Sequence, residues 1–235
     1  MKAELYEVSE ARIAFYEFLS GLYYRELTQE QIDHLRQVSF TELCTGDETL
    51  AQGGGLISHY LHTSMGDTRL DLAADYAYSI LAVGTYDARR AVPYESVFTS
   101  EEGRRMQDAR DDVYRRFCEE HLGVRKGLDV PEDHLSFMFD YMVALGKRFM
   151  GALDEDDYAQ AKKYLDLQAS FHEKHLINWI DAYCDVFDNT AQTDFYRGVS
   201  LLTRGWIHHE GETLKDMISL LGELYPQEQT DTTRG

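Results

Sequence analysis

Prolines are scarce in this sequence, and their scarcity limits what the chain can fold into. Only three occur among 235 residues, together with 17 glycines. Because proline interrupts helices and central strands, a chain with so few can form long helices. No segment alternates apolar and polar residues over a useful strand length. The sequence therefore predicts an all-α protein, built as a helical bundle of roughly 9–12 helices.

Apolar residues recur at helical spacing along most of the chain, and capping or turn residues divide it into segments. Thr28 followed by Gln31 forms a capping box that opens a short helix. The run Gly53–Gly55 predicts a loop, while Asp67 and Ser100 are placed to cap the helices that follow them. The expected helices cover residues 5–25, 28–36, 56–62, 67–84, 100–117, 131–153, 154–188 and 193–224. The last three are long enough to contain internal breaks.

The chain is strongly acidic, with 42 Asp and Glu residues against 23 Lys and Arg, a net charge of -19. This charge argues against nucleic acid or an anionic membrane as a partner and favours a basic ligand, although solubility alone would also explain it. No apolar run approaches the roughly 18–20 residues that span a bilayer, and no secretory signal is visible. Three widely spaced cysteines predict reduced thiols. We therefore expect a cytoplasmic protein.

The histidines offer a metal site as one interpretation. His172 and His175 are three residues apart and share a helix face, and with His208 or His209 they suggest a metal-dependent helical hydrolase. The spacing is not that of HExxH, however, and no third ligand is evident. There is also no GxSxG and no P-loop. The sequence predicts no catalytic residue, no metal and no cofactor.

The segment VPEDHL, residues 130–135, carries the densest group of polar residues ahead of an apolar run. Pro131 suits a first helical turn, and Glu132 and Asp133 place negative charge near the positive end of a helix. A stripe continues at helical spacing through four residues: His134, Phe137, Met138 and Tyr141. Spacing alone allows this stripe to be core or to form an aromatic groove with a polar end.

Five motifs in order resemble the TorD/DmsD/NarJ-type chaperones of redox-enzyme maturation. These motifs are Tyr78–Gly84 (YSILAVG), Val92–Phe98 (VPYESVF), Pro131–Leu135 (PEDHL), His175–Trp179 (HLINW) and Phe195–Arg197 (FYR). They span most of the chain after residue 67. Ala82 departs from the family pattern, which commonly has an aromatic residue there, so we expect a shallower groove and an uncertain client enzyme.

The resemblance implies one TorD-like domain over residues 1–235, with lobes at about 1–122 and 130–225. It places a hinge just before PEDHL, where GVRKGLD (residues 123–129) is the most linker-like stretch of the chain. Gly127 and Pro131 are the hinge residues expected from this resemblance. The oligomeric state is expected to be a monomer or a domain-swapped dimer.

The resemblance further implies a non-enzymatic role without a cofactor of its own. The expected partner is a molybdoenzyme precursor, bound through its twin-arginine signal peptide, its immature body or both, and held back from export until its molybdenum cofactor is inserted. The residues expected to bind the leader peptide are Tyr78, Leu81, Tyr94, Ser96, Glu132, Asp133, His134, Phe137 and Tyr141. Trp179 is expected in the core. Besides the hydrolase, a general acidic adaptor for basic proteins is an alternative function.

Overall fold

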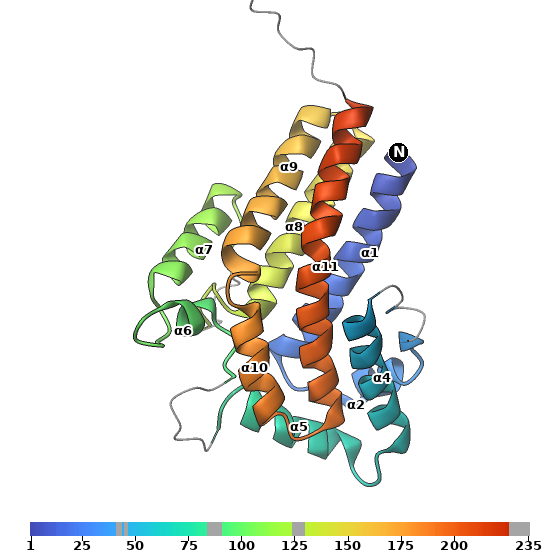
Figure 1. Cartoon of the computed structure of the whole chain (residues 1–235), viewed down its shortest axis with the longest axis vertical. Helices are drawn as coiled ribbons and strands as arrows, with labels where there is room; N and C mark the ends of the chain where they lie inside the picture. The colour runs from blue at the N-terminus through green and yellow to red at the C-terminus, as the bar shows by residue number, and fades with distance from the viewer. Residues whose placement is uncertain (41–43, 45–46, 84–90, 124–129, 226–235) are drawn as a thin grey trace, which may run out of the picture.

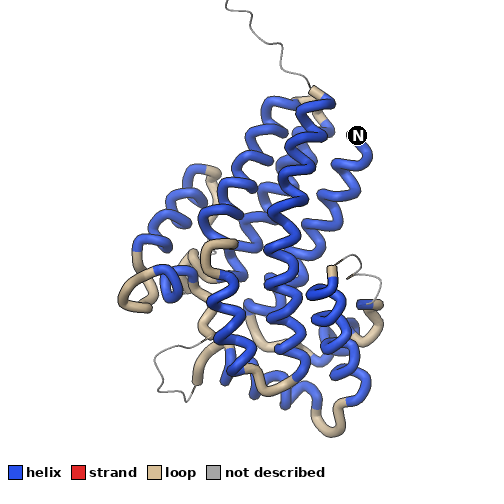
Figure 2. The backbone as a smooth tube through the Cα atoms, in the orientation of Figure 1, coloured by secondary structure: helices blue, strands red, loops and turns tan. Residues whose placement is uncertain are grey.

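The computed structural model describes residues 1–40, 44, 47–83, 91–123 and 130–225. Within these residues the chain forms ten α-helices and one π-helical turn, joined by loops, with no strand beyond an isolated bridge (Figure 2). The prediction of an all-α protein is confirmed. The helices are α1 (Lys2–Tyr24), α2 (Gln29–Leu35), α4 (Glu48–Thr63), α5 (Thr68–Ser79), α6 (Glu95–Thr99), α7 (Asp108–Glu119), α8 (Leu135–Asp154), α9 (Tyr158–Phe171), α10 (Ile180–Thr190) and α11 (Asp194–Leu224), with the π turn η1 (His172–Leu176) between α9 and α10.

Helices α1, α8, α9 and α11 form the centre of the molecule (Figure 1). Helix α1 packs on α8, α8 on α9, α9 on α11, and α11 back on α1, so their apolar faces close around one core. Helix α11 also contacts α4 and α10 in its N-terminal half, and the α6–α7 hairpin lies to one side of α9. Helix α1 therefore packs against helices of the segment predicted as the other lobe.

Helix α4 begins at Glu48, which corrects the prediction of a loop through Gly53–Gly55. The Asp47 side chain accepts a hydrogen bond from the Leu50 amide and caps the helix. Two glycines face each other where α4 meets α11: a Cβ added to Gly53 would lie 2.8 Å from the Gly198 carbonyl oxygen. The glycine run thus allows a close backbone approach within a helix and does not end one.

Helix α7 begins at Asp108, eight residues after the predicted Ser100 cap. Ser100 instead ends α6, and its hydroxyl accepts a hydrogen bond from the Arg104 amide. Gly103 and Met106 both adopt positive φ, at 61° and 64°, which a continuous helix cannot contain. The predicted helix over 100–117 is therefore wrong in its first two turns.

Helix α8 also begins later than predicted, at Leu135, so Pro131 does not lie in its first turn. The His134 amide donates to the Pro131 carbonyl in a separate turn, and the His134 side chain caps α8 by accepting from the Ser136 amide. The Leu135 amide donates a hydrogen bond to the carbonyl oxygen of Pro93, a residue of another loop. This tertiary hydrogen bond separates the turn from the helix.

The predicted hinge falls largely outside the described residues, since 124–129, including Gly127, are not among them. The division into two lobes therefore stays a prediction. Over the parts of the chain that the structure describes, no helix is long and apolar enough to cross a membrane.

Candidate functional site

Two of the motifs, VPYESVF and PEDHL, bind each other through their backbones. Tyr94 and His134 form an antiparallel bridge, and the Glu95 amide donates to the Asp133 carbonyl at 3.1 Å. The Asp133 carboxylate adds a second connection, because its Oδ2 accepts from both the amide (3.0 Å) and the hydroxyl of Ser96. Asp133 and Ser96, both predicted to bind the leader, therefore lie together, and their polar groups face each other.

Asp133 has no exposed surface in this structure. Its burial raises the pKa of the carboxyl group, and the bonds from Ser96 oppose that rise. The Oδ1 atom has no hydrogen-bond partner among the described residues. A guanidinium group could reach this carboxylate only if the PEDHL turn moved away from Ser96.

His134 is buried between two aromatic rings, with centroid distances of 5.0 Å to Tyr94 and 5.7 Å to Phe137. Its Nδ1 accepts from the Ser136 amide, so this nitrogen carries no proton. Burial lowers the pKa of the imidazole from 6.5 to about 4, because the charged ring would lose its hydration. His134 is a neutral helix cap against an aromatic stack.

This lowered pKa predicts an acid-dependent loss of stability. Between pH 6.5 and about 4, His134 binds more protons in the unfolded state than in the folded state. Its contribution to the free energy of unfolding is therefore fully present above pH 6.5 and is lost as the pH falls towards 4. The full shift corresponds to about 3 kcal/mol. We expect the stability difference between wild type and His134→Asn to shrink over this range in urea unfolding, because asparagine can still cap α8. A difference that stays constant from pH 7 to 4 would contradict the assignment.

The remaining predicted residues lie in different surroundings. Glu132 pairs with Arg110 of α7 at 2.7 Å and is largely covered. Tyr78 and Leu81 are about half exposed at the C-terminal end of α5. Phe137 and Tyr141 are buried on α8, where Tyr141 stacks on Phe117 of α7 at a centroid distance of 4.8 Å. These contacts connect the predicted residues to α7 as well as to α8.

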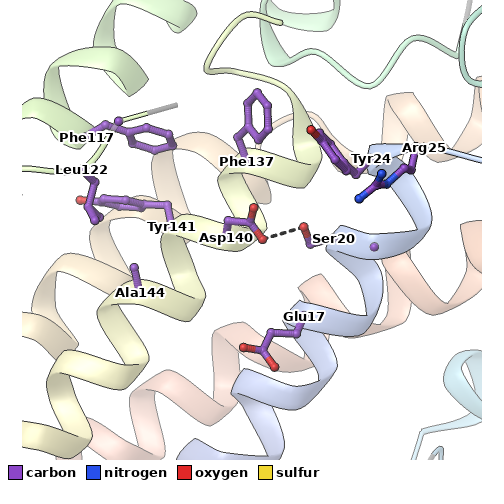
Figure 3. Close-up of a pocket in the computed structure, with 12 residues that line it drawn as sticks. Glu17, Ser20, Tyr24, Arg25, Phe117, Leu122, Phe137, Asp140, Tyr141 and Ala144 are labelled. Carbon is purple, nitrogen blue, oxygen red and sulfur yellow. Dashed lines mark hydrogen bonds between the residues drawn. The ribbon is translucent and has the colours of Figure 1, made fainter. Parts of the chain in front are cut away.

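A pocket of about 480 Å³ opens between α1, α8 and the end of α7 (Figure 3). Phe137 and Tyr141 belong to its lining, whereas the other predicted residues do not. Each of the two long helices contributes residues at i, i+3, i+4 and i+7. These residues are Glu17, Ser20, Gly21 and Tyr24 from α1, and Phe137, Asp140, Tyr141 and Ala144 from α8; Arg25, Phe117, Leu122 and Gly123 complete the lining.

The pocket combines two carboxylates with an aromatic wall. Asp140 Oδ1 accepts a hydrogen bond from the Ser20 hydroxyl at 2.7 Å (Figure 3). The surrounding side chains raise the pKa of Asp140 by desolvation, and repulsion from Glu17 adds to this rise. Glu17 itself pairs with Lys147 at 2.6 Å, and both side chains are more than half exposed. A cation entering here would meet an exposed carboxylate that is hydrogen-bonded by a neutral hydroxyl.

The sequence prediction missed Glu17, Ser20, Tyr24 and Asp140. Both helices carry their pocket residues at the spacing i, i+3, i+4 and i+7, but nothing in the sequence indicates that these two helix faces lie opposite each other.

Burial of Tyr141 raises the pKa of its phenol to about 12, so the Tyr141 side of the pocket stays uncharged.

The histidines proposed as metal ligands have other partners. His172 Nε2 lies 2.7 Å from the Ile207 carbonyl oxygen. His175 is buried between Glu95 Oε2 (2.9 Å) and Asp112 Oδ2 (2.8 Å), and so connects η1 with α6 and α7. In the described part of the chain, no group of three or more His, Cys, Asp or Glu side chains could hold a metal ion.

Comparison of the sequence with known proteins shows which family the chain belongs to. A family model described as the nitrate reductase delta subunit matches residues 47–185, more than half of the chain. The chain is 27% identical over 199 residues to the chaperone protein TorD of Vibrio atlanticus, covering 83% of this chain and 90% of that protein. It is 25% identical over 226 residues to TorD of Vibrio cholerae, covering 93% and 98%. These relatives are named chaperones, not enzymes, and the chain belongs to the nitrate reductase delta subunit family, which includes the TorD-type chaperones that its motifs resemble.

Proposed function

We propose that this protein is a cytoplasmic chaperone that binds the twin-arginine signal peptide of a molybdenum-cofactor oxidoreductase precursor in the pocket between α1 and α8. The proposal depends above all on one observation. Two carboxylates, Glu17 and Asp140, lie beside an aromatic wall in a pocket open to solvent. Bound there, the leader would be withheld from export while the cofactor is inserted into the immature enzyme body.

The chemistry of the pocket suits an arginine side chain better than a lysine. A guanidinium group offers several N–H donors in one plane, which match the oxygens of a carboxylate, and its flat face packs on aromatic rings. Asp140 accepts from the neutral Ser20 hydroxyl and has no ion pair among the described residues. The net charge of -19 would also increase the rate at which a basic peptide meets the protein.

The residues predicted from the sequence take different parts in this proposal. Phe137 and Tyr141 form the aromatic wall, and Tyr94 and His134 pack behind Phe137. Asp133 holds Ser96 and so keeps the PEDHL turn in place. These residues would shape the site, whereas the carboxylates of the pocket would contact the arginines.

The other predicted residues suit two further parts of the proposal. Glu132 secures α7 through Arg110, and α7 supplies Phe117 to the wall. Tyr78 and Leu81 are exposed and available for the immature body of the client.

Two charge-neutralising variants test the proposal. Asp140→Asn and Glu17→Gln are each expected to weaken binding of a synthetic Arg-Arg leader peptide by roughly 10- to 100-fold, the loss of one charge-assisted hydrogen bond. Binding would be measured by isothermal titration calorimetry. Glu212→Gln is the matched control, since Glu212 also forms an exposed ion pair with a lysine, Lys215, outside the pocket.

A Lys-Lys version of the peptide separates this function from that of an acidic adaptor. We expect it to bind at least tenfold more weakly than the Arg-Arg peptide, because an ammonium group cannot make the paired hydrogen bonds of a guanidinium. Equal affinities for the two peptides, or equal losses for Asp140→Asn and Glu212→Gln, would favour the adaptor and contradict the pocket.

A further inference from the structure

A second pocket adjoins the first across helix α1. It has a volume of about 830 Å³ and lies between α1, α2 and the loop that joins them. Both pockets include Glu17 and Gly21 in their linings, so they meet at this face of α1. The apolar side chains of the second pocket are Phe18, Leu22, Leu27 and Leu35.

Gly21 lies at the point where the two pockets meet. A Cβ added there would have no other atom within 4 Å, apart from its own helix backbone and chain neighbours. Glycine is unfavourable in the interior of a helix, and close packing, which explains Gly53 and Gly198, does not explain Gly21. Because Gly21 has no side chain, the surface between the two pockets stays open at this position.

The two pockets differ in the side chains that surround their carboxylates. In the second pocket the Asp33 carboxylate already pairs with Arg36 at 2.7 Å. In the first, Asp140 is bonded by a neutral hydroxyl. The second pocket also has Glu30, which forms no ion pair among the described residues, and the first has Arg25, so charge alone does not assign the arginines. Only the first pocket combines a carboxylate with an aromatic wall on which a guanidinium can pack, and the leucine-rich second pocket suits an apolar segment.

We infer that the two pockets form one groove that crosses α1 at Gly21, with the leader's arginines in the first pocket and the apolar stretch that follows them in the second. This inference rests on the proposed function and adds a binding site for the second half of the same peptide. A receptor that holds both parts binds arginines tightly only when an apolar segment follows at the right distance. That requirement would distinguish a leader from other basic surfaces.

Substitutions at Gly21 test whether the passage is used. Gly21→Leu would place a side chain between the pockets while improving helix propensity, so the fold should be retained and the melting temperature should not fall. Two synthetic peptides serve as probes: Arg-Arg followed by an apolar run of leucine and alanine, and Arg-Arg alone with polar residues after it. Gly55→Leu is the matched control, because Gly55 lies in α4 and also has no atom within 4 Å of an added Cβ.

We expect wild type to bind the apolar-tailed peptide at least tenfold more tightly than the polar-tailed one, and Gly21→Leu to remove this difference. Gly21→Ala, which adds one methyl group, should have an intermediate effect, and Gly55→Leu none. Undiminished binding of the tailed peptide to Gly21→Leu would overturn the joined groove. Equal weakening of both peptides would also overturn it, by assigning Gly21 to the arginine pocket alone.

Failure of the underlying function would look different. In that case Asp140→Asn would bind both peptides as wild type does, whatever residue stands at position 21.

Discussion

Replacing Arg12 by methionine is expected to lower the free energy of unfolding by about 3–5 kcal/mol. Arg12 of α1 forms an ion pair with Glu210 of α11, and both side chains are almost fully buried, at 4% and 0% exposed. Arg12 Nε lies 2.9 Å from Glu210 Oε2, and Nη2 lies 2.8 Å from Gln168 Oε1 on α9. Removing the cation would leave the Glu210 carboxylate buried without a counter-charge, which is the main cause of the loss.

A double variant distinguishes this mechanism from simple loss of packing. Arg12→Met combined with Glu210→Met leaves no buried charge, so it should be markedly more stable than Arg12→Met alone. Urea unfolding of the wild type, both single variants and the double variant would measure this coupling. If the losses of the single variants simply add, the pair contributes no coupling energy and the explanation is wrong.

Trp179→Ala is expected to have a loss of similar size, about 3–5 kcal/mol, because it removes a large side chain from the core. Trp179 is 2% exposed and stacks on Phe98 at a centroid distance of 5.5 Å. Its indole Nε1–H donates to the His175 carbonyl at 2.6 Å, which ties α10 to the π turn. The prediction that Trp179 belongs to the core is confirmed by its burial.

Two measurements on this residue separate core from groove. Trp179→Phe keeps most of the ring volume and should recover much of the stability in thermal or chemical unfolding. Leader-peptide affinity of the folded Trp179→Ala protein should change little. An unchanged melting temperature together with lost binding would move Trp179 from the core to the binding site.

Local signals in the sequence predicted several helix boundaries well. The capping box of Thr28 and Gln31 is present with both of its hydrogen bonds, and Asp67 caps α5. Both caps act within three residues of sequence, so no tertiary information is needed to recognise them. The overall fold class was predictable for the same reason, since helical periodicity is also local.

The boundaries that failed depend on contacts between distant segments. Gly53 continues a helix because Gly198 of α11 approaches it, and no local pattern reveals that partner. Pro131 stays outside α8 because the Leu135 amide bonds to Pro93, 42 positions earlier in the chain. In each case a tertiary contact overrides the local preference of the residue.

The candidate site shows the same division. The stripe containing Phe137 and Tyr141 was visible on one helix, and both residues line the pocket. Asp140 was not recognised because its partner, Ser20, is 120 residues away. Asp133 was predicted to bind the leader because it is a charged residue ahead of a helix, but its carboxylate is buried and accepts a hydrogen bond from the Ser96 amide.

The π turn between α9 and α10 has a consequence for how the chain length can vary here. The Ile177 amide bonds to the His172 carbonyl, five residues back, whereas a regular helical turn closes over four. The turn therefore holds one surplus residue, and a homologue shorter by one position could close a regular α-helical turn here, with the break at Trp179 (φ -136°) still following it. Without the extra residue of the π turn, the side chains of His172 and His175 would not both point into the core of such a homologue. It would then need another way of fastening the α6–α7 hairpin to the bundle.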